Sequence, residues 1–178
     1  MALEEYLAFE AQAKTKHEFW DGHVIAMAGA SVPHNRVTSN LVTEFNIHLR
    51  DRDCHAIAAD LRVEVGTRYV YPDIVVECGE PDLTEADPPS LRNPALLVEV
   101  ASPSTASRDR GEKLHAYARL SSLHEYWIVD TDRAAVTQYI RRGEEWVMQA
   151  VLGLEAAVQS THFGIDIPLR AIYRRVLS

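Results

Sequence analysis

Two carboxylates, Asp73 and Glu99, each interrupt a nearly unbroken apolar run of β-forming residues. The runs span residues 69–77 and 95–101, and runs of this kind are typical of strands that are buried on both faces. An unpaired carboxylate buried there costs several kcal/mol, so we expect both side chains to share a cation, accept hydrogen bonds or lie where the sheet opens. Two acids on neighbouring strands supply the oxygen ligands that Mg²⁺ binds.

A lysine on the following segment is a candidate partner for these acids. The pattern predicts a helix over about residues 108–120, with Leu114 and Tyr117 on its apolar stripe. Lys113 stands four residues before Tyr117, at the border of that stripe, so its ammonium group can reach toward the sheet. Asp109 precedes Lys113 by four residues and could hold it by an ion pair along the helix.

Several motifs in a fixed order give the chain a resemblance to a known family. They are Tyr71-Pro72-Asp73, residues 97–105, Asp109, Lys113, Tyr117 and residues 125–130. On these grounds the chain resembles the Uma-type restriction endonuclease family, which belongs to the restriction-endonuclease-like PD-(D/E)XK superfamily. The resemblance runs from residues 18–22 to Tyr173. It implies an α/β fold in which a mixed β-sheet is flanked by helices, with the helix that bears the lysine on one side and the N-terminal helices on the other.

The resemblance also implies a chemistry, the metal-dependent hydrolysis of DNA phosphodiester bonds by an endonuclease. Asp73 and Glu99 would hold Mg²⁺ or Mn²⁺, with the main-chain carbonyl of Val100 as a third oxygen ligand and water completing the shell. The superfamily pattern has a lysine two residues after the second acid, where this chain has Ala101. The role of that lysine would therefore pass to Lys113 on the helix.

Two further residues are site candidates through the same resemblance. Glu18 corresponds to an acid that N-terminal elements of such folds contribute as an additional metal or water contact; otherwise it is a surface acid on an edge strand. His34 lies near the start of a helix predicted for residues 31–50, with Ser31 as its N-cap. This histidine could contact a phosphate or orient water, or it could simply occupy the exposed end of the helix.

Bulk properties bound the class of protein. A length of 178 residues and a hydrophobic fraction of 47% suit a single domain over residues 1–178. We see no charged-then-apolar leader and no run of about eighteen apolar residues, so we expect a cytoplasmic protein with no membrane partner. Cys54 and Cys78 lack the spacing of metal ligands, and we expect two buried, reduced thiols.

The charge balance counts against easy binding of nucleic acid. The formal net charge is −8, whereas proteins that bind phosphates usually present a basic face. The distribution of charge matters more than its sum, however. Each of several arginines could contact phosphate or could equally be a solvated surface residue: Arg36, Arg50, Arg52, Arg68, Arg108 and Arg110.

The remaining pattern predicts the elements around the site. Asp21-Gly22 predicts the turn of a hairpin, and the apolar spacing before it predicts an N-terminal helix that covers the sheet. Three β-prone runs joined by short turns predict an antiparallel C-terminal meander. The expected elements are a helix at residues 2–14, an alternating strand at 55–65, a surface loop at 79–94, a tight polar loop at 102–105, and meander strands at 125–130, 135–140 and 145–150.

Two other functions stay open at this point. A catalytically inactive restriction-like fold could act as a dimeric scaffold or a DNA-associated accessory protein, which the acidic balance and Ala101 favour. The same acids could also serve hydrolysis of a phosphodiester other than DNA. Divalent metal binding through Asp73 and Glu99 separates an enzyme from a scaffold. We expect a homodimer, because a twofold axis would direct two equivalent sites at the two strands of a duplex.

Overall fold

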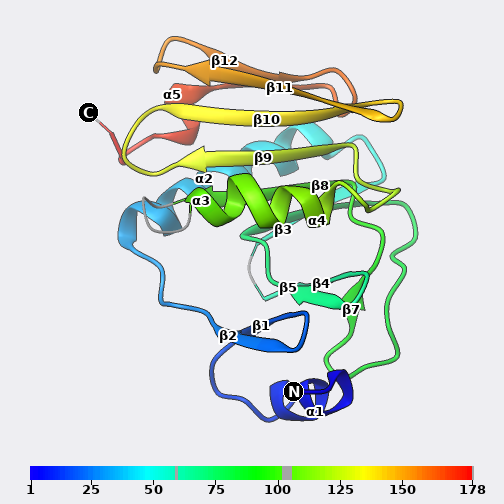
Figure 1. The fold of residues 1–178 in the computed structure, drawn as a ribbon. Coiled ribbons are helices and arrows are strands. Elements are labelled where there is room, and N and C mark those ends of the chain that lie inside the picture. The colour runs from blue at the N-terminus through cyan, green and yellow to red at the C-terminus, as the bar shows by residue number, and fades with distance from the viewer. Residues whose placement is uncertain (59, 102–105, 178) are drawn as a thin grey trace.

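The computed structural model describes residues 1–58, 60–101 and 106–177 (Figure 1). The helices are α1 (Leu3–Glu10), α2 (Val32–Leu49), α3 (Ala106–Arg108), the π-helical η1 (Asp109–Lys113), α4 (Leu114–Tyr117) and α5 (Leu169–Ile172). The strands are β1 (His17–Trp20), β2 (His23–Ala26), β3 (Cys54–Ala58), β4 (Arg62–Val65), β5 (Arg68–Val70), β6 (Ile74–Cys78), β7 (Ser90–Leu91), β8 (Leu96–Ala101), β9 (Glu125–Asp130), β10 (Ala135–Arg142), β11 (Glu145–Leu152), β12 (Ala157–Ser160) and β13 (Ile165–Pro168).

The strands form a large sheet and a smaller one. The large sheet has the order β11-β10-β9-β8-β6-β3, and its β8 and β9 are parallel while its other pairs are antiparallel. The smaller sheet has the order β2-β1-β5-β4-β7, and β12 pairs with β13 separately. The predicted mixed α/β fold and the predicted antiparallel meander, here β9-β10-β11, are therefore confirmed.

One long hairpin is shared by both sheets. β3 pairs with β6 in the large sheet, and β4 pairs with β5 in the smaller one. The chain leaves the large sheet near Asp60, whose φ of +62° is a left-handed conformation that ends a strand. It returns at Pro72, which lacks the amide hydrogen that a strand ladder needs. The unbroken strands predicted at residues 55–65 and 69–77 are therefore wrong, because each is two strands in different sheets. The second bend places Asp73 at the start of β6.

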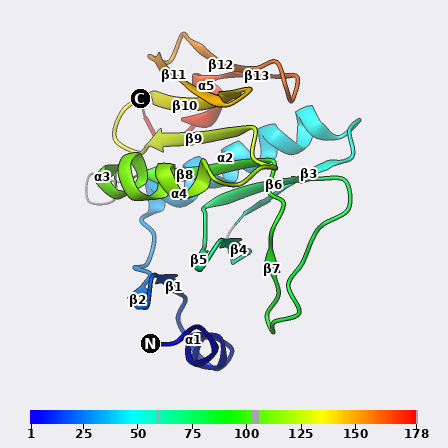
Figure 2. The ribbon, with the colours of Figure 1, turned by 45° about the vertical axis from the view of Figure 1, so that its right-hand side comes forward.

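Helices cover the two faces of the large sheet (Figures 1 and 2). On one face, Phe45 of α2 lies against Trp127 of β9 with ring centroids 5.3 Å apart. On the other face, Tyr117 of α4 meets Tyr126 of β9 at 5.0 Å. Adjacent residues of a strand point to opposite faces, so β9 contributes to both cores. The helix that bears Lys113 and the N-terminal helix α2 thus lie on opposite sides, as predicted.

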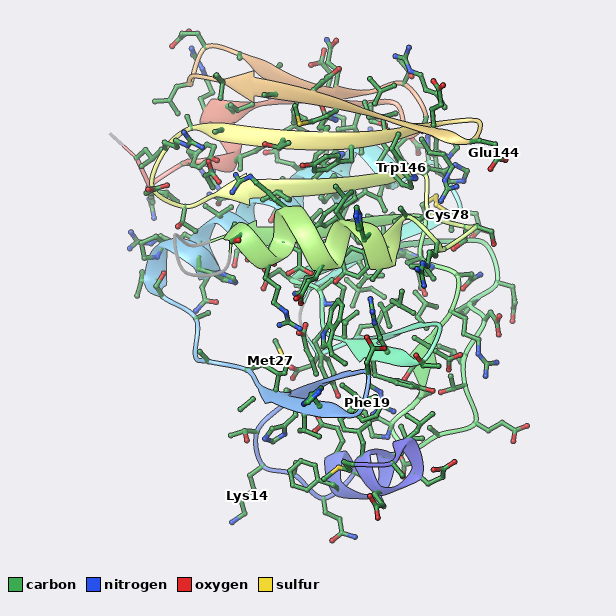
Figure 3. The ribbon with its side chains drawn as sticks, in the orientation of Figure 1. Lys14, Phe19, Met27, Cys78, Glu144 and Trp146 are labelled. Carbon is green, nitrogen blue, oxygen red and sulfur yellow. A yellow bond between two sulfur atoms is a disulfide. The ribbon has the colours of Figure 1, made fainter. Side chains whose placement is uncertain are left out.

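The first helix does not reach the large sheet. α1 packs on the smaller sheet, where Tyr6 lies 4.9 Å from Phe19 and 6.0 Å from Tyr69 between ring centroids. Phe19, labelled in Figure 3, comes from β1, at the α1 side of the molecule. Of the N-terminal helices expected beside the large sheet, only α2 lies there. α1 packs instead on aromatic residues of the smaller sheet, a sheet that the sequence pattern did not predict.

Local signals identified the turn and the cap correctly. Asp21 and Gly22 have φ values of +47° and +89°, the left-handed conformations that a tight hairpin turn requires. The Ser31 side chain accepts a hydrogen bond of 3.3 Å from the amide of His34 at the start of α2. The surface loop at residues 79–94 includes the short strand β7. The polar loop predicted at residues 102–105 lies outside the described residues.

The two cysteines form a disulfide, so the expectation of reduced thiols is wrong. Cys54 and Cys78 are direct partners in the antiparallel β3–β6 pair, with Cα atoms 4.0 Å apart (Figure 3). Their separation of 24 residues in the sequence carries no sign of this register. Disulfides are rare in cytosolic proteins, so this bond speaks against the expected cytoplasmic location. That location stays a prediction. None of the described helices combines the length and apolar character needed to cross a membrane.

The packing of α2 gives a test of this fold. Phe45 is fully buried against Trp127, whereas Ile47 on the same helix is 53% exposed. We expect Phe45→Ala to lower the free energy of unfolding by about 3 to 5 kcal/mol, because it leaves a cavity in the main core. Ile47→Ala should change it by less than about 0.5 kcal/mol. Urea denaturation of both variants measures this difference, and equal effects would contradict the placement of α2.

Candidate active site

The candidate site lies where the two sheets meet. Five segments of the chain contribute to it: the residue just before β6, the middle of β8, the end of η1, the strand β1 and the first turn of α2. They carry the five residues whose side chains were predicted to act, which are Asp73, Glu99, Lys113, Glu18 and His34. The structure joins them into two linked clusters, one buried and one at the surface.

The buried cluster centres on Lys113. Its Nζ lies 2.9 Å from Oε1 of Glu99 and 3.1 Å from Oε1 of Glu18. All three residues are at most 6% exposed. Burial alone would lower the pKa of Lys113, but Glu99, Glu18 and Asp109 raise it above its ordinary value. The lysine is therefore a fixed positive charge between strands of two different sheets.

The π-helical turn η1 sets the direction of Lys113. A turn of this kind contains one more residue than an α-helical turn and often occurs at functional sites. Within it, Nζ of Lys113 lies 3.8 Å from Oδ1 of Asp109, and the hydroxyl of Tyr126 donates a hydrogen bond of 3.1 Å to the main-chain carbonyl of Asp109. The helix predicted at residues 108–120 is confirmed as α3, η1 and α4, and it ends at Tyr117.

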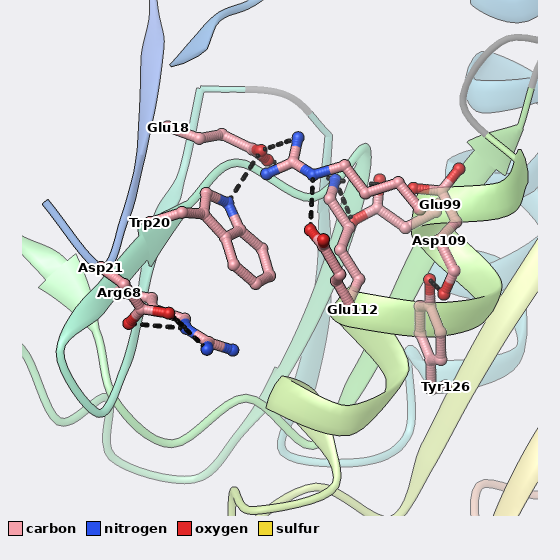
Figure 4. Close-up of polar contacts among 10 residues, drawn as sticks. Glu18, Trp20, Asp21, Arg68, Glu99, Asp109, Glu112 and Tyr126 are labelled. Carbon is pink, nitrogen blue, oxygen red and sulfur yellow. Dashed lines mark hydrogen bonds and ion pairs between the residues drawn. The ribbon is translucent and has the colours of Figure 1, made fainter. Parts of the chain in front are cut away.

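Glu18 faces the helix from the smaller sheet (Figure 4). Its Oε2 lies 2.7 Å from Nη1 of Arg108 and accepts a hydrogen bond of 3.2 Å from the indole of Trp20. Burial would raise the pKa of Glu18, but Lys113 and Arg108 hold it below its ordinary value. With 3% exposure, Glu18 is not the surface acid that the sequence left as an alternative.

Glu99 points to the face of the large sheet that α4 covers. Its Oε1 accepts a hydrogen bond of 2.7 Å from the hydroxyl of Tyr117. Burial raises the pKa of Glu99 to about 8; Lys113 opposes this rise, and the nearby acids Asp73, Asp109 and Glu18 add to it. The crowding of negative charge at Glu99 would be relieved by a further cation.

Asp73 and His34 form the outer cluster. Nε2 of His34 lies 2.9 Å from Oδ1 of Asp73, and the amide of Val100 donates a hydrogen bond of 2.7 Å to Oδ2. Burial would lower the pKa of His34, but Asp73 and the main-chain carbonyl of Val100 raise it. The side chains of His34 and Asp73 are 19% and 21% exposed, so the site opens to solvent on their side.

Two residues have roles in the site that their sequence pattern did not predict. Tyr117 was assigned to the apolar stripe, yet its hydroxyl holds Glu99. Arg108 was considered as a phosphate contact, yet it pairs with Glu18 and stacks over Trp20, with its guanidinium carbon 4.7 Å from the ring centroid. A tyrosine four residues after the lysine was a usable signal for the first. Nothing in the local sequence connects Arg108 to a strand 90 residues earlier.

The other arginines proposed as phosphate contacts divide into two groups. Arg50, Arg68 and Arg110 each pair with a carboxylate, from Asp51, Asp21 and Asp130 respectively. Arg36 and Arg52 donate hydrogen bonds to main-chain carbonyls instead. Contact of these five arginines with nucleic acid stays a prediction.

The donors at the site fit a hard divalent cation. Asp73 and Glu99 offer carboxylate oxygens, and Val100 holds Asp73 beside Glu99 through its amide. Such oxygens are the ligands that Mg²⁺ and Mn²⁺ prefer. Among the described residues, no three histidine, cysteine, aspartate or glutamate side chains gather closely enough to hold a metal. A cation at this point would therefore also need main-chain or water oxygens.

A mixed sheet with one acid just before β6, a second on the adjacent strand β8 and a lysine that contacts the second acid has the architecture of a restriction-endonuclease-like protein. The chain belongs to the Uma2 family, described as "putative restriction endonuclease", whose family model matches residues 3–170. The resemblance noted from the motifs is therefore confirmed.

The chain is also similar to two bacterial proteins and to a solved structure. The chain is 34% identical over 158 residues to the uncharacterized protein sll1609 of Synechocystis sp., covering 87% of this chain and 89% of that protein. It is 33% identical over 178 residues to slr1290 of the same organism, covering 97% and 93%. The crystal structure of a putative nuclease belonging to DUF820 from Anabaena variabilis matches with a TM-score of 0.80 and 19% identity, over 99% of both chains. That likeness establishes the fold.

The pKa of Glu99 predicts a pH dependence of stability in EDTA. The pKa rises from 4.5 to about 8 on folding, so between these values the folded state keeps a proton that the unfolded state has lost. This contribution is complete below pH 4.5 and disappears as the pH rises through 8. From pH 5 to pH 8 the wild type should lose about 1 kcal/mol or more relative to Glu99→Gln, because one pKa unit corresponds to about 1.4 kcal/mol. Urea denaturation at both pH values measures this; a relative gain would show that Glu99 is ionised.

Proposed function

We propose that this protein is a metal-dependent DNA endonuclease. The observation that carries the proposal is the position of Lys113, whose Nζ lies 2.9 Å from Glu99 although the usual lysine position is Ala101. A lysine buried against Glu99 would supply the positive charge that β8 lacks because its position 101 is alanine. Membership of the Uma2 family supports a nuclease, and the site supports the finer assignment to metal-dependent hydrolysis.

Asp73 and Glu99 would hold Mg²⁺ or Mn²⁺, together with the main-chain carbonyl of Val100 and water. Such a metal lowers the pKa of bound water and neutralises charge on a phosphate. Asp73 is suited to this because the amide of Val100 fixes its carboxylate against β8, while its side of the site remains open to solvent. Carboxylate oxygens have more than one lone pair, so these hydrogen bonds leave capacity for a ligand.

Lys113 would orient the attacking water and stabilise the negative charge that develops on the phosphate oxygens. Its ammonium group is held by Glu18, Glu99 and Asp109, so little reorganisation is needed when the charge develops. Glu18 acts here as a positioning residue, because Arg108 and Lys113 occupy its two oxygens.

His34 would stand at the entrance of the site. Its contact with Asp73 orients that carboxylate, and its partial exposure leaves the ring accessible to a phosphate. A homodimer would suit cleavage of duplex DNA, since a twofold axis directs two equivalent sites at the two strands.

A cleavage assay with a matched pair of variants tests the proposal. Supercoiled plasmid and single-stranded DNA are incubated with Mg²⁺, with Mn²⁺ or with EDTA, and nicking is scored on a gel. Asp73→Asn keeps the shape of the side chain and removes its charge, so we expect a loss of activity of about 100-fold or more, the order of effect that loss of one preorganised charge produces. Asp132→Asn changes an exposed acid after β9 and should leave cleavage unchanged.

Metal binding distinguishes a protein that has the metal site but does not cut DNA from a protein that has no metal site. Calorimetry and thermal unfolding with Mg²⁺ or Mn²⁺ should show binding and a raised Tm for the wild type and for Asp132→Asn, and neither for Asp73→Asn. If the wild type neither cuts DNA nor binds these metals at millimolar concentration, the enzyme proposal is wrong and a scaffold role takes its place.

The role of Lys113 has its own test. Lys113→Met keeps the length of the side chain and removes its charge, so we expect cleavage to fall by about 100-fold or more while the metal still binds. Circular dichroism and the Tm must first establish that the variant folds, because the loss leaves buried acids unpaired. A folded Lys113→Met variant with full activity would exclude the lysine from the chemistry.

A further inference from the structure

A groove lies where the first half of α2 passes the C-terminal tail. It encloses about 490 Å³. The residues that line it come from one face of the helix and from the tail: Val32, Asn35, Arg36, Ser39, Asn40, Arg174 and Arg175. On the helix they recur with the spacing of three and four residues that defines a single face.

The charge of this groove is unusual for the chain. Of the residues that line it, three are arginines and none is acidic, although the whole chain has a net charge of −8. By contrast, a second hollow beside Trp20 contains Asp21 and Glu112 as well as Arg68 and Arg119. The guanidinium groups, the Asn35 amide and the Ser39 hydroxyl of the first groove are donors of the kind that phosphate oxygens accept from.

Hydrogen bonds fix the tail against the helix. Nη1 of Arg36 donates a bond of 2.8 Å to the carbonyl of Arg175. Nδ2 of Asn40 donates to the carbonyls of Ile172 and Arg174, at 2.9 and 3.0 Å. The main chain that carries Arg174 and Arg175 is therefore held in place, while both side chains are exposed. An anchored backbone reduces the entropy that a ligand must overcome on binding.

The groove adjoins the open side of the candidate site. His34 and Arg36 lie in the first turns of the same helix, with His34 toward Asp73 and Arg36 toward the tail. Figures 1 and 2 show the start of α2, α3 and the C-terminus on the same side of the molecule. His34 and Arg36 are two residues apart, about 200° around the helix axis, so the body of α2, about 10 Å across, lies between their side chains. A nucleic-acid strand has one phosphate per about 3.4 Å of axis, so a few nucleotides span that width.

We propose that this groove, defined by Arg36, Arg174 and Arg175, binds the phosphate backbone of the nucleic-acid strand whose scissile phosphate lies at Asp73. The inference rests on the proposed endonuclease function, because it names the path of that substrate. The strand passes from the site around the start of α2 and onto the tail. Phosphate contacts of this kind position the strand without reading its sequence.

The test measures DNA binding in EDTA, where the proposed chemistry cannot proceed. Fluorescence anisotropy of labelled single-stranded and duplex DNA is recorded between 50 and 200 mM NaCl for the wild type, Arg174→Glu and Lys14→Glu. Both substitutions change the net charge equally, but Lys14 lies exposed after α1, far from the groove (Figure 3). We expect Arg174→Glu to weaken binding by about tenfold and to reduce the salt slope by about 0.9 on duplex DNA or about 0.7 on single-stranded DNA, the values for one phosphate contact.

The Lys14→Glu control distinguishes binding of DNA in the groove from a general effect of net charge on binding. Lys14→Glu should alter the affinity by less than about twofold, since exposed charges beyond a Debye length are screened. The inference is overturned if the wild type shows no salt-dependent binding, if Arg174→Glu binds like the wild type, or if both variants lose affinity equally. A double variant, Arg174→Ala with Arg175→Ala, should reproduce the loss without introducing a negative charge.

Failure of this inference and failure of the enzyme proposal give different results. If plasmid is cut but Arg174→Glu binds and cuts normally, the endonuclease stands and the groove is not on the path of the strand. If DNA binds through Arg174 but the wild type cuts nothing with any metal, the groove stands on a DNA-binding protein that is not a nuclease.

Discussion

The ion cluster around Lys113 is the constraint on which the rest of the structure depends. Three acids surround one buried ammonium group, and they come from the large sheet, the smaller sheet and the helix itself. A buried charge without its partners costs several kcal/mol, so each element must be in place for the others to be stable. The cluster therefore couples the assembly of the two sheets to the assembly of the site.

The division between a buried and an exposed cluster also orders the chemistry. Glu99 and Lys113 lie where water is excluded and charges interact strongly, whereas Asp73 and His34 lie at the opening. In the proposed function, a substrate would meet the outer pair first, and the arginines beside α2 lie on that side. On that side three arginines, Arg36, Arg174 and Arg175, line a groove with no acidic residue, although the net charge of the chain is −8.

The sequence predicted the parts of the site that depend on local pattern. The strand of Glu99, the helix of Lys113, the cap at Ser31 and the Asp21-Gly22 turn each follow from spacing or residue type. What could not be predicted depends on register and on sheet switching. The bends at Asp60 and Pro72 divide two apparent strands, and only the resulting smaller sheet explains α1, the burial of Glu18 and its pairing with Arg108. The Cys54–Cys78 bond depends on the register of β3 with β6 in the same way.

The π-helical turn η1 has a consequence for how such proteins can vary. Before it, Arg108 is directed at the smaller sheet; after it, Tyr117 is directed at the large one. One residue corresponds to about 100° of rotation in a helix, so the extra residue sets the angle between these two directions. Loss of a single residue there would rotate the part of the helix before η1 relative to the part after it, without any change in the sequence of the strands. A change of length at this joint would therefore alter the geometry of the site without any substitution among its acids.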